Sequence, residues 1–267
     1  MTLPVLGIIA GKGDLPDEIV NIYAANGGNC FVASIDEDRS CNGVPCKIFT
    51  LGCVGTVLEY FEENKVENVT IVGGVKRPDL KSLKVDWGGA ALIANIMKQK
   101  ILGDDNVLTI VMDHITKKGF NVISPLDILV VNNKNMVFTK KKPSKNDSSD
   151  IEFGAAILKN LGKLDVGQSV IVCDSYALGV EAAEGTDNLI RRCDLLRKKD
   201  KGGALVKMPK LIQDMRLDVP VIGPDTIFCL AKHGFSGLAI ETKGVIVIKP
   251  EETQRLLEEN NLFLEYI

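Results

Sequence analysis

The chain has 267 residues, of which 45% are hydrophobic and 25% are charged, a composition that can build a sizeable core and favours two domains over one. The formal net charge of −3 argues against nucleic acid as the main partner, because proteins that bind phosphate backbones usually carry a basic surplus. The sequence has neither an apolar run of about eighteen residues nor the pattern of a secretory signal, so we expect a cytoplasmic protein. The seven cysteines include no Cys-x-x-Cys pair, and we expect reduced thiols rather than a disulfide framework.

Residues 5–10 form a continuous apolar run that is typical of a parallel strand buried on both faces. Gly11 and Gly13 then predict a turn into a helix that ends near residue 26, and residues 31–35 supply the next strand. We interpret this βαβ unit as the start of a Rossmann-like parallel-sheet domain. Its first loop would then hold a nucleotide or a phosphate sugar at the N-terminus of the helix.

A dinucleotide-binding site is the alternative interpretation of this loop. Gly11 and Gly13 match the first two glycines of G-x-G-x-x-G, and Asp36 lies about where a ribose-binding acid would fall. Pro16 stands at the third glycine position, where its ring would crowd the close packing of helix and strand. We therefore keep an NAD(P)-binding oxidoreductase as the second choice.

The α/β rhythm continues in residues 46–72, where two strands flank a helix, and it leads into a loop at residues 73–79. Because ligands bind outside the carboxyl ends of parallel strands, this loop and the loop at residues 11–14 would line one crevice. Arg77 is placed there to clamp a phosphate, although an exposed arginine at the end of a loop fits the sequence equally well. Helical spacing follows in residues 90–100 and 105–118.

Residues 136–150 are polar and rich in helix breakers, which predicts a linker between an N-terminal domain of residues 1–135 and a C-terminal α/β domain of residues 151–267. The lysines of this segment would also suit a peripheral contact with the anionic surface of the inner membrane, and we prefer the linker interpretation. In the C-terminal half we expect helices near residues 149–161, 226–233 and 250–260, and strands at residues 170–173, 237–240 and 244–248.

Acidic and basic residues are interleaved between Glu181 and Asp225, among glycine and proline residues that favour turns. A pyrophosphate carries dense negative charge, so we expect carboxylates near it to act through Mg²⁺ or Mn²⁺, while lysine and arginine hold its outer oxygens. Gly185 and Thr186 predict a loop that enters a helix, where backbone N–H groups can hold an oxyanion.

Each acidic residue in this stretch also has a purely structural interpretation. Asp187 lies four residues before Arg191, and the two would pair on a solvated helix face. Asp218 alternates with apolar neighbours, so a short strand would hold its carboxylate on the opposite face from them. The structural alternative for Asp218 is an ion pair with Arg216, two residues away on the same strand face.

Several separate motifs occur in one order along the chain. They are Gly7-Ile-Ile-Ala-Gly-Lys-Gly-Asp-Leu-Pro, Gly74-Val-Lys-Arg-Pro-Asp, Gly103-Asp-Asp, Glu184-Gly-Thr-Asp followed by Arg191-Arg, and Lys207-x-Pro-Lys-x-x-Gln-Asp-x-Arg-x-Asp-x-Pro. Together they resemble the UDP-2,3-diacylglucosamine pyrophosphatases of lipid A synthesis, in the two-domain type that is unrelated to calcineurin-like phosphoesterases. The resemblance runs from about residue 5 to the C-terminus.

The resemblance implies an enzyme that splits UDP-2,3-diacylglucosamine with water into UMP and 2,3-diacylglucosamine 1-phosphate, at a site between the two domains. It also implies that Asp218, the aspartate of Arg-x-Asp-x-Pro, serves the metal or the attacking water. The candidate catalytic residues are thus Asp218, Asp187 and Asp214, with Asp218 as the metal ligand. The candidate substrate-binding residues are Gly11, Gly13, Arg77, Thr186, Arg191, Lys207, Lys210, Gln213 and Arg216. A non-catalytic nucleotide-sugar binding module is a third alternative.

Overall fold

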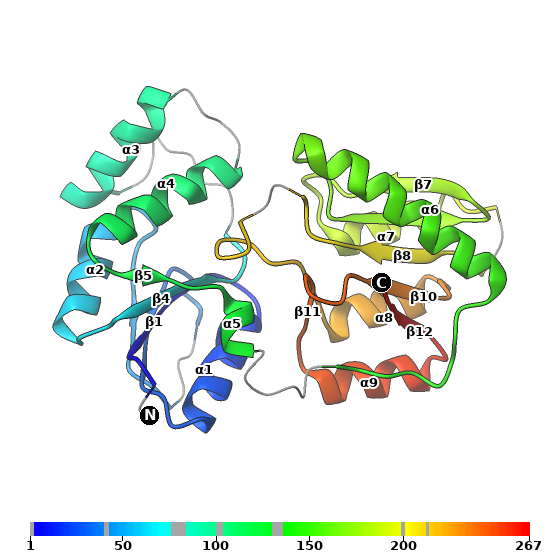
Figure 1. Ribbon diagram of the computed structural model, residues 1–267, viewed down its shortest axis with the longest axis horizontal. Helices are drawn as coiled ribbons and strands as arrows, with labels where there is room; N and C mark the ends of the chain where they lie inside the picture. Colours follow the sequence, from blue (N-terminus) through cyan, green and yellow to red (C-terminus); the bar gives the residue numbers. More distant parts are fainter. Residues whose placement is uncertain are drawn as a thin grey trace. The chain divides into compact units, whose positions relative to one another are not determined.

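The computed structural model describes residues 3–39, 43–75, 84–99, 104–129, 136–198, 201–211 and 214–267. The chain divides into two compact units, each with its own sheet (Figure 1). Unit 1 comprises Met1–Val131 and Asp214–Asp218, and unit 2 comprises Asn132–Gln213 and Val219–Ile267. The expected α/β fold class, with a parallel sheet in the N-terminal half, is confirmed.

The sheet of unit 1 is parallel throughout, in the order β3-β2-β1-β4-β5. The elements are β1 (Leu6–Ala10), α1 (Leu15–Ala25), β2 (Cys30–Ser34), β3 (Cys46–Ile48), α2 (Val54–Glu63), β4 (Asn68–Val72), α3 (Trp87–Gln99), α4 (Asp104–Lys117), β5 (Asn121–Val122) and α5 (Pro125–Leu129). The apolar run at residues 5–10 forms the central strand β1, in which Leu6 and Ile8 are fully buried, as its composition predicts. The strand order reverses between β1 and β4, which makes this the switch point where α/β sheets bind ligands.

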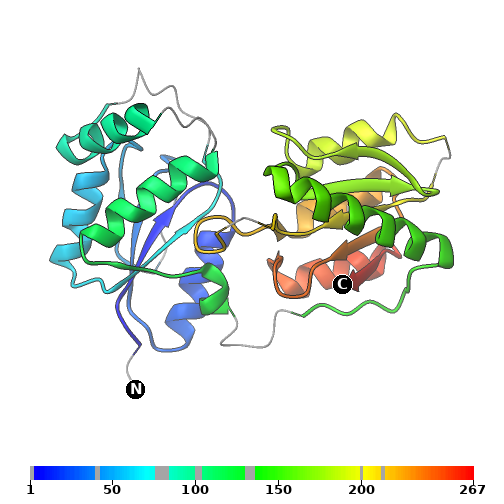
Figure 2. The ribbon, with the colours of Figure 1, turned by 45° about the horizontal axis from the view of Figure 1, so that its top comes forward.

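Unit 2 is built on a mixed sheet in the order β12-β10-β8-β6-β7, in which β6 runs antiparallel to both of its neighbours. The elements are α6 (Lys145–Leu161), a 3₁₀ turn (Gly162–Leu164), β6 (Ser169–Cys173), β7 (Tyr176–Val180), α7 (Thr186–Asp194), β8 (Ala204–Lys207), β9 (Val221–Ile222), α8 (Pro224–Lys232), β10 (Gly237–Ile240), β11 (Ile246–Val247), α9 (Pro250–Glu259) and β12 (Phe263–Tyr266). Alternate residues of the strands face opposite layers. One face packs against α7, α8 and α9, and the other packs against α6 (Figures 1 and 2).

Residues 136–150 do not form the free linker that their composition suggests. Val137 is 1% exposed and belongs to the hydrophobic core of unit 2. Helix α6 begins at Lys145 rather than near residue 149, because Ser144 and Asp147 form a capping box at its N-terminus. The burial of Val137 and a short capping motif therefore hold parts of this segment in place.

Cys46 is disulfide-bonded, which corrects the expectation that the thiols are all reduced. Among the residues that the structure describes, the free cysteines are Cys30, Cys53, Cys173, Cys193 and Cys229. Whether two cysteines can bond depends on the distance and direction between their Cβ atoms, and spacing along the sequence does not reveal this geometry.

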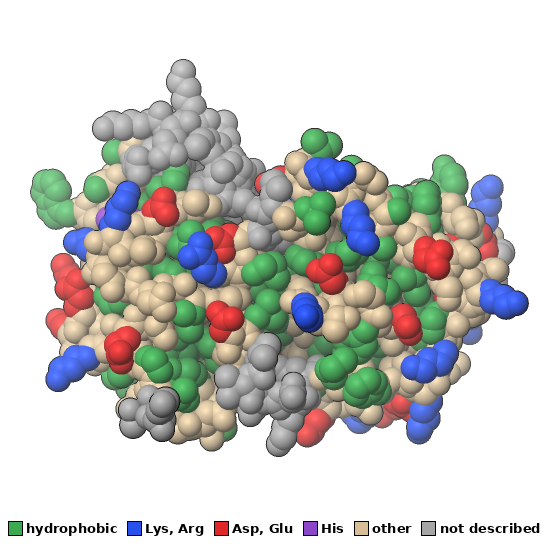
Figure 3. Space-filling model, in the orientation of Figure 1, with side chains coloured by type: hydrophobic (Ala, Val, Ile, Leu, Met, Phe, Trp, Pro, Cys, Tyr) green, Lys and Arg blue, Asp and Glu red, His purple; other side chains and the backbone are tan. Residues whose placement is uncertain are grey.

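The surface carries charges of both signs. On the face drawn in Figure 3, Lys and Arg side chains are interspersed with Asp and Glu, in keeping with the small net charge of −3. None of the helices in the described ranges is long and apolar enough to cross a membrane.

Candidate active site

The loop after β1 is fastened to the loop after β4 at the switch point of unit 1. Lys12 N–H donates to Gly74 O and Gly74 N–H donates to Lys12 O, both at 2.8 Å. A Cβ on Gly11 would come within 2.6 Å of Gly74 O, so the close approach of the two backbones requires glycine there. The predicted neighbourhood of these two loops is confirmed.

Arg39 fixes the conformation of the glycine loop. Its side chain is 5% exposed and donates to Gly11 O at 2.7 Å and to Gly13 O at 2.9 Å. The same guanidinium pairs with Asp17 in the first turn of α1 at 2.7 Å. No sequence motif points to Arg39, because its side chain reaches back to a loop that lies far from it along the chain.

Asp36 follows β2, at the position weighed for ribose binding in the dinucleotide interpretation. It faces Lys12 Nζ at 3.6 Å, so its negative charge is partly balanced within the protein. Pro16 lies in the first turn of α1, where proline is well tolerated.

The strand predicted around Asp218 is wrong, because residues 214–218 form a turn. Leu217 N–H donates to Asp214 O at 2.9 Å, and Asp214 Oδ1 accepts from the N–H of Arg216 at 3.0 Å. Such local hydrogen bonds compete with an extended strand. The side chain of Arg216 pairs with Asp214 at 2.6 Å rather than with Asp218, and this bond lowers the pKa of Asp214.

The same turn belongs to unit 1, although the residues on either side of it belong to unit 2. Ser124, just beyond β5, donates its hydroxyl to Met215 O at 2.6 Å. Leu217 is 7% exposed and packs in the hydrophobic core of unit 1. Ser124 lies just beyond the carboxyl end of β5, so its bond to Met215 anchors the turn that contains Asp218 near that end of the strand.

In unit 2 the buried Lys207 is joined to a carboxylate through one hydroxyl. Lys207 ends β8, is 5% exposed and donates from Nζ to Thr186 Oγ1 at 2.6 Å. Thr186 Oγ1 donates in turn to Glu181 Oε1 at 3.1 Å, and Ser169 Oγ lies 3.5 Å from the same hydroxyl. Glu181 Oε2 is buried and has no hydrogen-bond partner among the described residues. Ser169 and Glu181 were not among the candidates expected from the sequence.

Helix α7 begins at Thr186, as predicted. Gly185 precedes it with a φ of 81°, a conformation that favours glycine, and provides no side-chain cap for the first N–H groups. Arg191 donates a hydrogen bond to Asn188 Oδ1 at 2.8 Å, and it acts on Asp187 through its charge. The start of α7 therefore has uncapped N–H groups, which can receive an anion.

Asp187 is half-buried in a field of mixed charges. Burial raises its pKa, and the charges of Asp225 and Glu181 add to the rise. The positive charges of Arg191 and Lys207 act in the opposite direction, and the net pKa is raised. Asp187 is thus a carboxyl whose ionisation depends on its neighbours.

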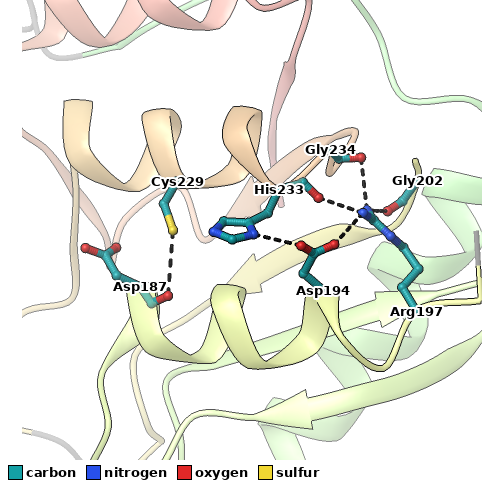
Figure 4. Close-up of polar contacts among 7 residues, drawn as sticks. All are labelled: Asp187, Asp194, Arg197, Gly202, Cys229, His233 and Gly234. Carbon is teal, nitrogen blue, oxygen red and sulfur yellow. Dashed lines mark hydrogen bonds and ion pairs between the residues drawn. The ribbon is translucent and has the colours of Figure 1, made fainter. Parts of the chain in front are cut away.

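Helix α7 is clamped to α8 at both ends (Figure 4). Near its start, Cys229 Sγ donates to Asp187 O at 3.6 Å. At its end, Asp194 bonds His233 Nδ1 at 2.8 Å and pairs with Arg197, also at 2.8 Å. The Arg197 guanidinium also donates to the carbonyls of Gly202, His233 and Gly234. This clamp holds the helix that positions Thr186, and it includes His233, the C-cap residue of α8.

Three further candidates complete the set of substrate-binding residues expected from the sequence. Lys210 is paired with Asp165 Oδ1 at 2.5 Å. Arg77 and Gln213 lie outside the described residues.

Carboxylates in the described ranges do not form a ready-made metal site. No group of three or more His, Cys, Asp or Glu side chains there is arranged to hold a metal ion. Carboxylate oxygens are nevertheless the ligands that Mg²⁺ and Mn²⁺ prefer, and Mg²⁺ commonly binds through one or two carboxylates plus substrate phosphates. The carboxylates therefore fit a metal ion whose coordination is completed by substrate oxygens, and not an ion held by protein side chains alone.

Two family models together span nearly the whole chain. The model of the LpxI N-terminal domain matches residues 5–130, and that of the LpxI C-terminal domain matches residues 134–265. The chain belongs to the LpxI family. A relative from Caulobacter vibrioides, named UDP-2,3-diacylglucosamine pyrophosphatase LpxI, is 30% identical over 268 residues, which cover 97% of this chain and 96% of the relative. The resemblance drawn from the ordered motifs is confirmed.

Proposed function

We propose that the chain hydrolyses the pyrophosphate bond of UDP-2,3-diacylglucosamine to UMP and 2,3-diacylglucosamine 1-phosphate in lipid A synthesis. Membership of the LpxI family supports this activity, because the matched relative is named for it. The structural observation that supports the proposal is the turn of residues 214–218, which the Ser124 bond to Met215 and the packing of Leu217 anchor to unit 1.

Binding of the phosphates falls to the cationic and N–H groups of unit 2. Lys207 is held by Thr186 at the end of β8, so its ammonium has little freedom to lose when an anion binds. The uncapped start of α7 adds backbone N–H donors and the positive end of a helix dipole. These groups would hold phosphate oxygens and stabilise the charge that develops during hydrolysis.

Activation of water requires a group that accepts its proton, and Asp218 is the carboxylate that we assign to this part of the reaction. Its backbone is fixed on one side by Leu217 in the core and by the Ser124 bond to Met215. Asp214 is a weaker choice, because its carboxylate is already engaged by Arg216.

We further propose that Mg²⁺ or Mn²⁺ takes part. Asp218 would hold the ion together with oxygens of the substrate, and the bound ion would neutralise charge and act as a Lewis acid at the pyrophosphate. Sharing of the ligands between Asp218 and the substrate fits a chain whose described carboxylates do not form a closed metal site.

The test incubates the full chain with UDP-2,3-diacylglucosamine and Mg²⁺ and measures UMP. We expect equimolar UMP and diacylglucosamine 1-phosphate, and loss of both in EDTA with recovery on adding Mg²⁺ or Mn²⁺. Absence of UMP with every divalent metal tried would overturn the proposed hydrolysis. Full activity in excess EDTA would overturn the metal requirement alone.

A further inference from the structure

The exposed face of α3 in unit 1 is apolar. Among residues 87–94, the exposed positions are Trp87, Ala90, Ala91 and Ala94, which follow the i, i+3, i+4, i+7 spacing of one helix face. Trp87 is 95% exposed. The outward face of a helix is ordinarily polar, so a face of tryptophan and alanine indicates an apolar environment on that side.

Packing on the opposite side fixes which face of α3 points outward. Leu92 is 6% exposed and packs against Ile110 of α4, with Val54 and Val111 around them. Helix α3 lies beside α4 in both views of the chain (Figures 1 and 2). The exposed positions are therefore not free to turn into the core.

Trp87 is held in place at a firmly capped helix start. Asp86 Oδ1 accepts from Gly89 N–H at 2.6 Å, and Asp86 Oδ2 accepts from the N–H and the hydroxyl of Thr56, at 2.7 and 2.8 Å. Thr56 lies in the first turn of α2, so one carboxylate caps two helices. Exposure of the indole is thus a property of an ordered helix start and not of a frayed one.

Basic side chains accompany this apolar face. Lys84 is exposed shortly before α3, and Lys117 and Lys118 are exposed at the end of α4. Burial first, and then the charges of Lys118 and Lys117, lower the pKa of His114, while the charge of Asp86 acts in the opposite direction.

Three other charged side chains have partners of their own. Asp113, also exposed on α4, interacts electrostatically with Arg216 and raises its pKa after the larger effects of Asp214. Among the lysines of residues 136–150, Lys140 pairs with Glu258 at 3.2 Å and Lys141 donates to Ser236 O at 2.9 Å. The segment weighed for membrane contact from the sequence therefore uses these two lysines within unit 2.

We propose that unit 1 binds the surface of an anionic lipid bilayer through the α3 surface, which consists of Trp87, Ala90, Ala91 and Ala94 with Lys84, Lys117 and Lys118. The indole takes the position that tryptophan prefers at the boundary between headgroups and acyl chains. The small alanines let the helix lie close to that boundary, and the lysines meet anionic headgroups. This property goes beyond the hydrolysis and is measured without substrate.

The test uses the intrinsic fluorescence of the full chain, because Trp87 is its single tryptophan. Vesicles of phosphatidylcholine with phosphatidylglycerol are compared with vesicles of phosphatidylcholine alone, each with and without brominated acyl chains. We expect a blue shift and quenching by the brominated lipid, both stronger with the anionic vesicles. Vesicle binding without any change in Trp87 emission overturns the proposal, as does no binding. A blue shift that grows with protein concentration in the absence of lipid also overturns it, in favour of a second copy of the chain.

Variants that keep the tryptophan identify the surface. The double substitution Ala91→Glu with Ala94→Glu places two negative charges on exposed positions, and we expect vesicle binding to weaken by about tenfold or more. The matched control is Leu195→Glu, at an 87% exposed leucine of unit 2, which should bind vesicles as the wild type does. Unchanged binding by the double variant overturns the proposal. If that variant does not fold, Lys117→Gln with Lys118→Gln replaces it, and the preference for anionic vesicles should fall; an unchanged preference would overturn the role of the lysines.

Discussion

Lys207 Nζ lies 2.6 Å from Thr186 Oγ1, and the lysine is 5% exposed. Burying an ammonium group is costly unless hydrogen bonds and opposite charge compensate it. Thr186 accepts this hydrogen bond, and its hydroxyl donates in turn to Glu181. The result is a fixed positive charge at the end of β8, beside the uncapped start of α7. We infer that these groups serve to bind an anion.

Replacement of Lys207 by methionine keeps most of the side-chain volume and removes the charge. We expect Lys207→Met to lower kcat/KM by about 10²-fold, because a charge-assisted hydrogen bond to the substrate phosphates is lost. Removing one member of a buried pair should also reduce the free energy of unfolding by about 1–3 kcal/mol. Kinetics and urea unfolding measure the two effects, with exposed Lys243→Met as the control. A folded Lys207→Met enzyme within about threefold of the wild type would contradict the assignment.

The acid limb of the pH profile tests Asp187. Its pKa is raised by burial first, and Asp225 adds to the rise while Arg191 opposes it. If turnover needs ionised Asp187, Asp225→Asn should move the acid limb of kcat/KM to lower pH, and Arg191→Gln should move it to higher pH. Exposed Glu252→Gln is the control and should leave the limb in place. Shifts of the same sign in both variants would contradict this electrostatic account of Asp187.

The raised pKa of Asp187 also predicts the direction in which stability changes with pH. Because the folded pKa of Asp187 lies above the ordinary value, the folded state favours the protonated carboxyl. The contribution of this group to stability is therefore full below the unfolded pKa and is lost as pH rises through the folded pKa. Urea unfolding of the wild type and of Asp187→Asn across this range should show their difference in stability change in that direction.

Arg197, in the clamp between α7 and α8, is buried, whereas Arg255 on α9 is exposed. Arg197 has a side chain that is 3% exposed, and it bonds Asp194 and three backbone carbonyls. We expect Arg197→Ala to lower the free energy of unfolding by about 2–4 kcal/mol, because several buried acceptors lose their donor. Arg255 pairs only with Glu259 on the surface of α9, and Arg255→Ala should cost less than about 1 kcal/mol. Equal costs in urea unfolding would contradict the importance of the clamp.

Much of the fold follows from apolar periodicity. The runs at residues 5–10 and 170–173 became β1 and β6, and the predicted helix at residues 250–260 matches α9. Strand β7 was missed, since its hairpin turn at Asp174 and Ser175 has positive φ at both residues without a glycine to signal it. The antiparallel direction of β6 likewise depends on pairing that a single sequence does not reveal.

The candidate site was only partly predictable, because its geometry depends on contacts between distant residues. The sequence identified Thr186 and Lys207 from their chemistry, and the structure brings them into one hydrogen bond. The sequence placed Asp218 on a strand of the C-terminal domain, whereas the Ser124 bond to Met215 ties its turn to unit 1. That bond joins residues 91 positions apart, and no local pattern predicts it.

The most direct measurement is the release of UMP from UDP-2,3-diacylglucosamine by the Asp218→Asn enzyme. Asp218 is half-buried on a turn that Leu217 anchors, so the variant should melt at the temperature of the wild type. Loss of a general base or metal ligand should lower kcat by about 10²-fold or more. Exposed Glu59→Gln, on α2 of the same unit, is the matched control and should retain full turnover. A folded Asp218→Asn enzyme within about tenfold of the wild type would contradict the assignment of Asp218.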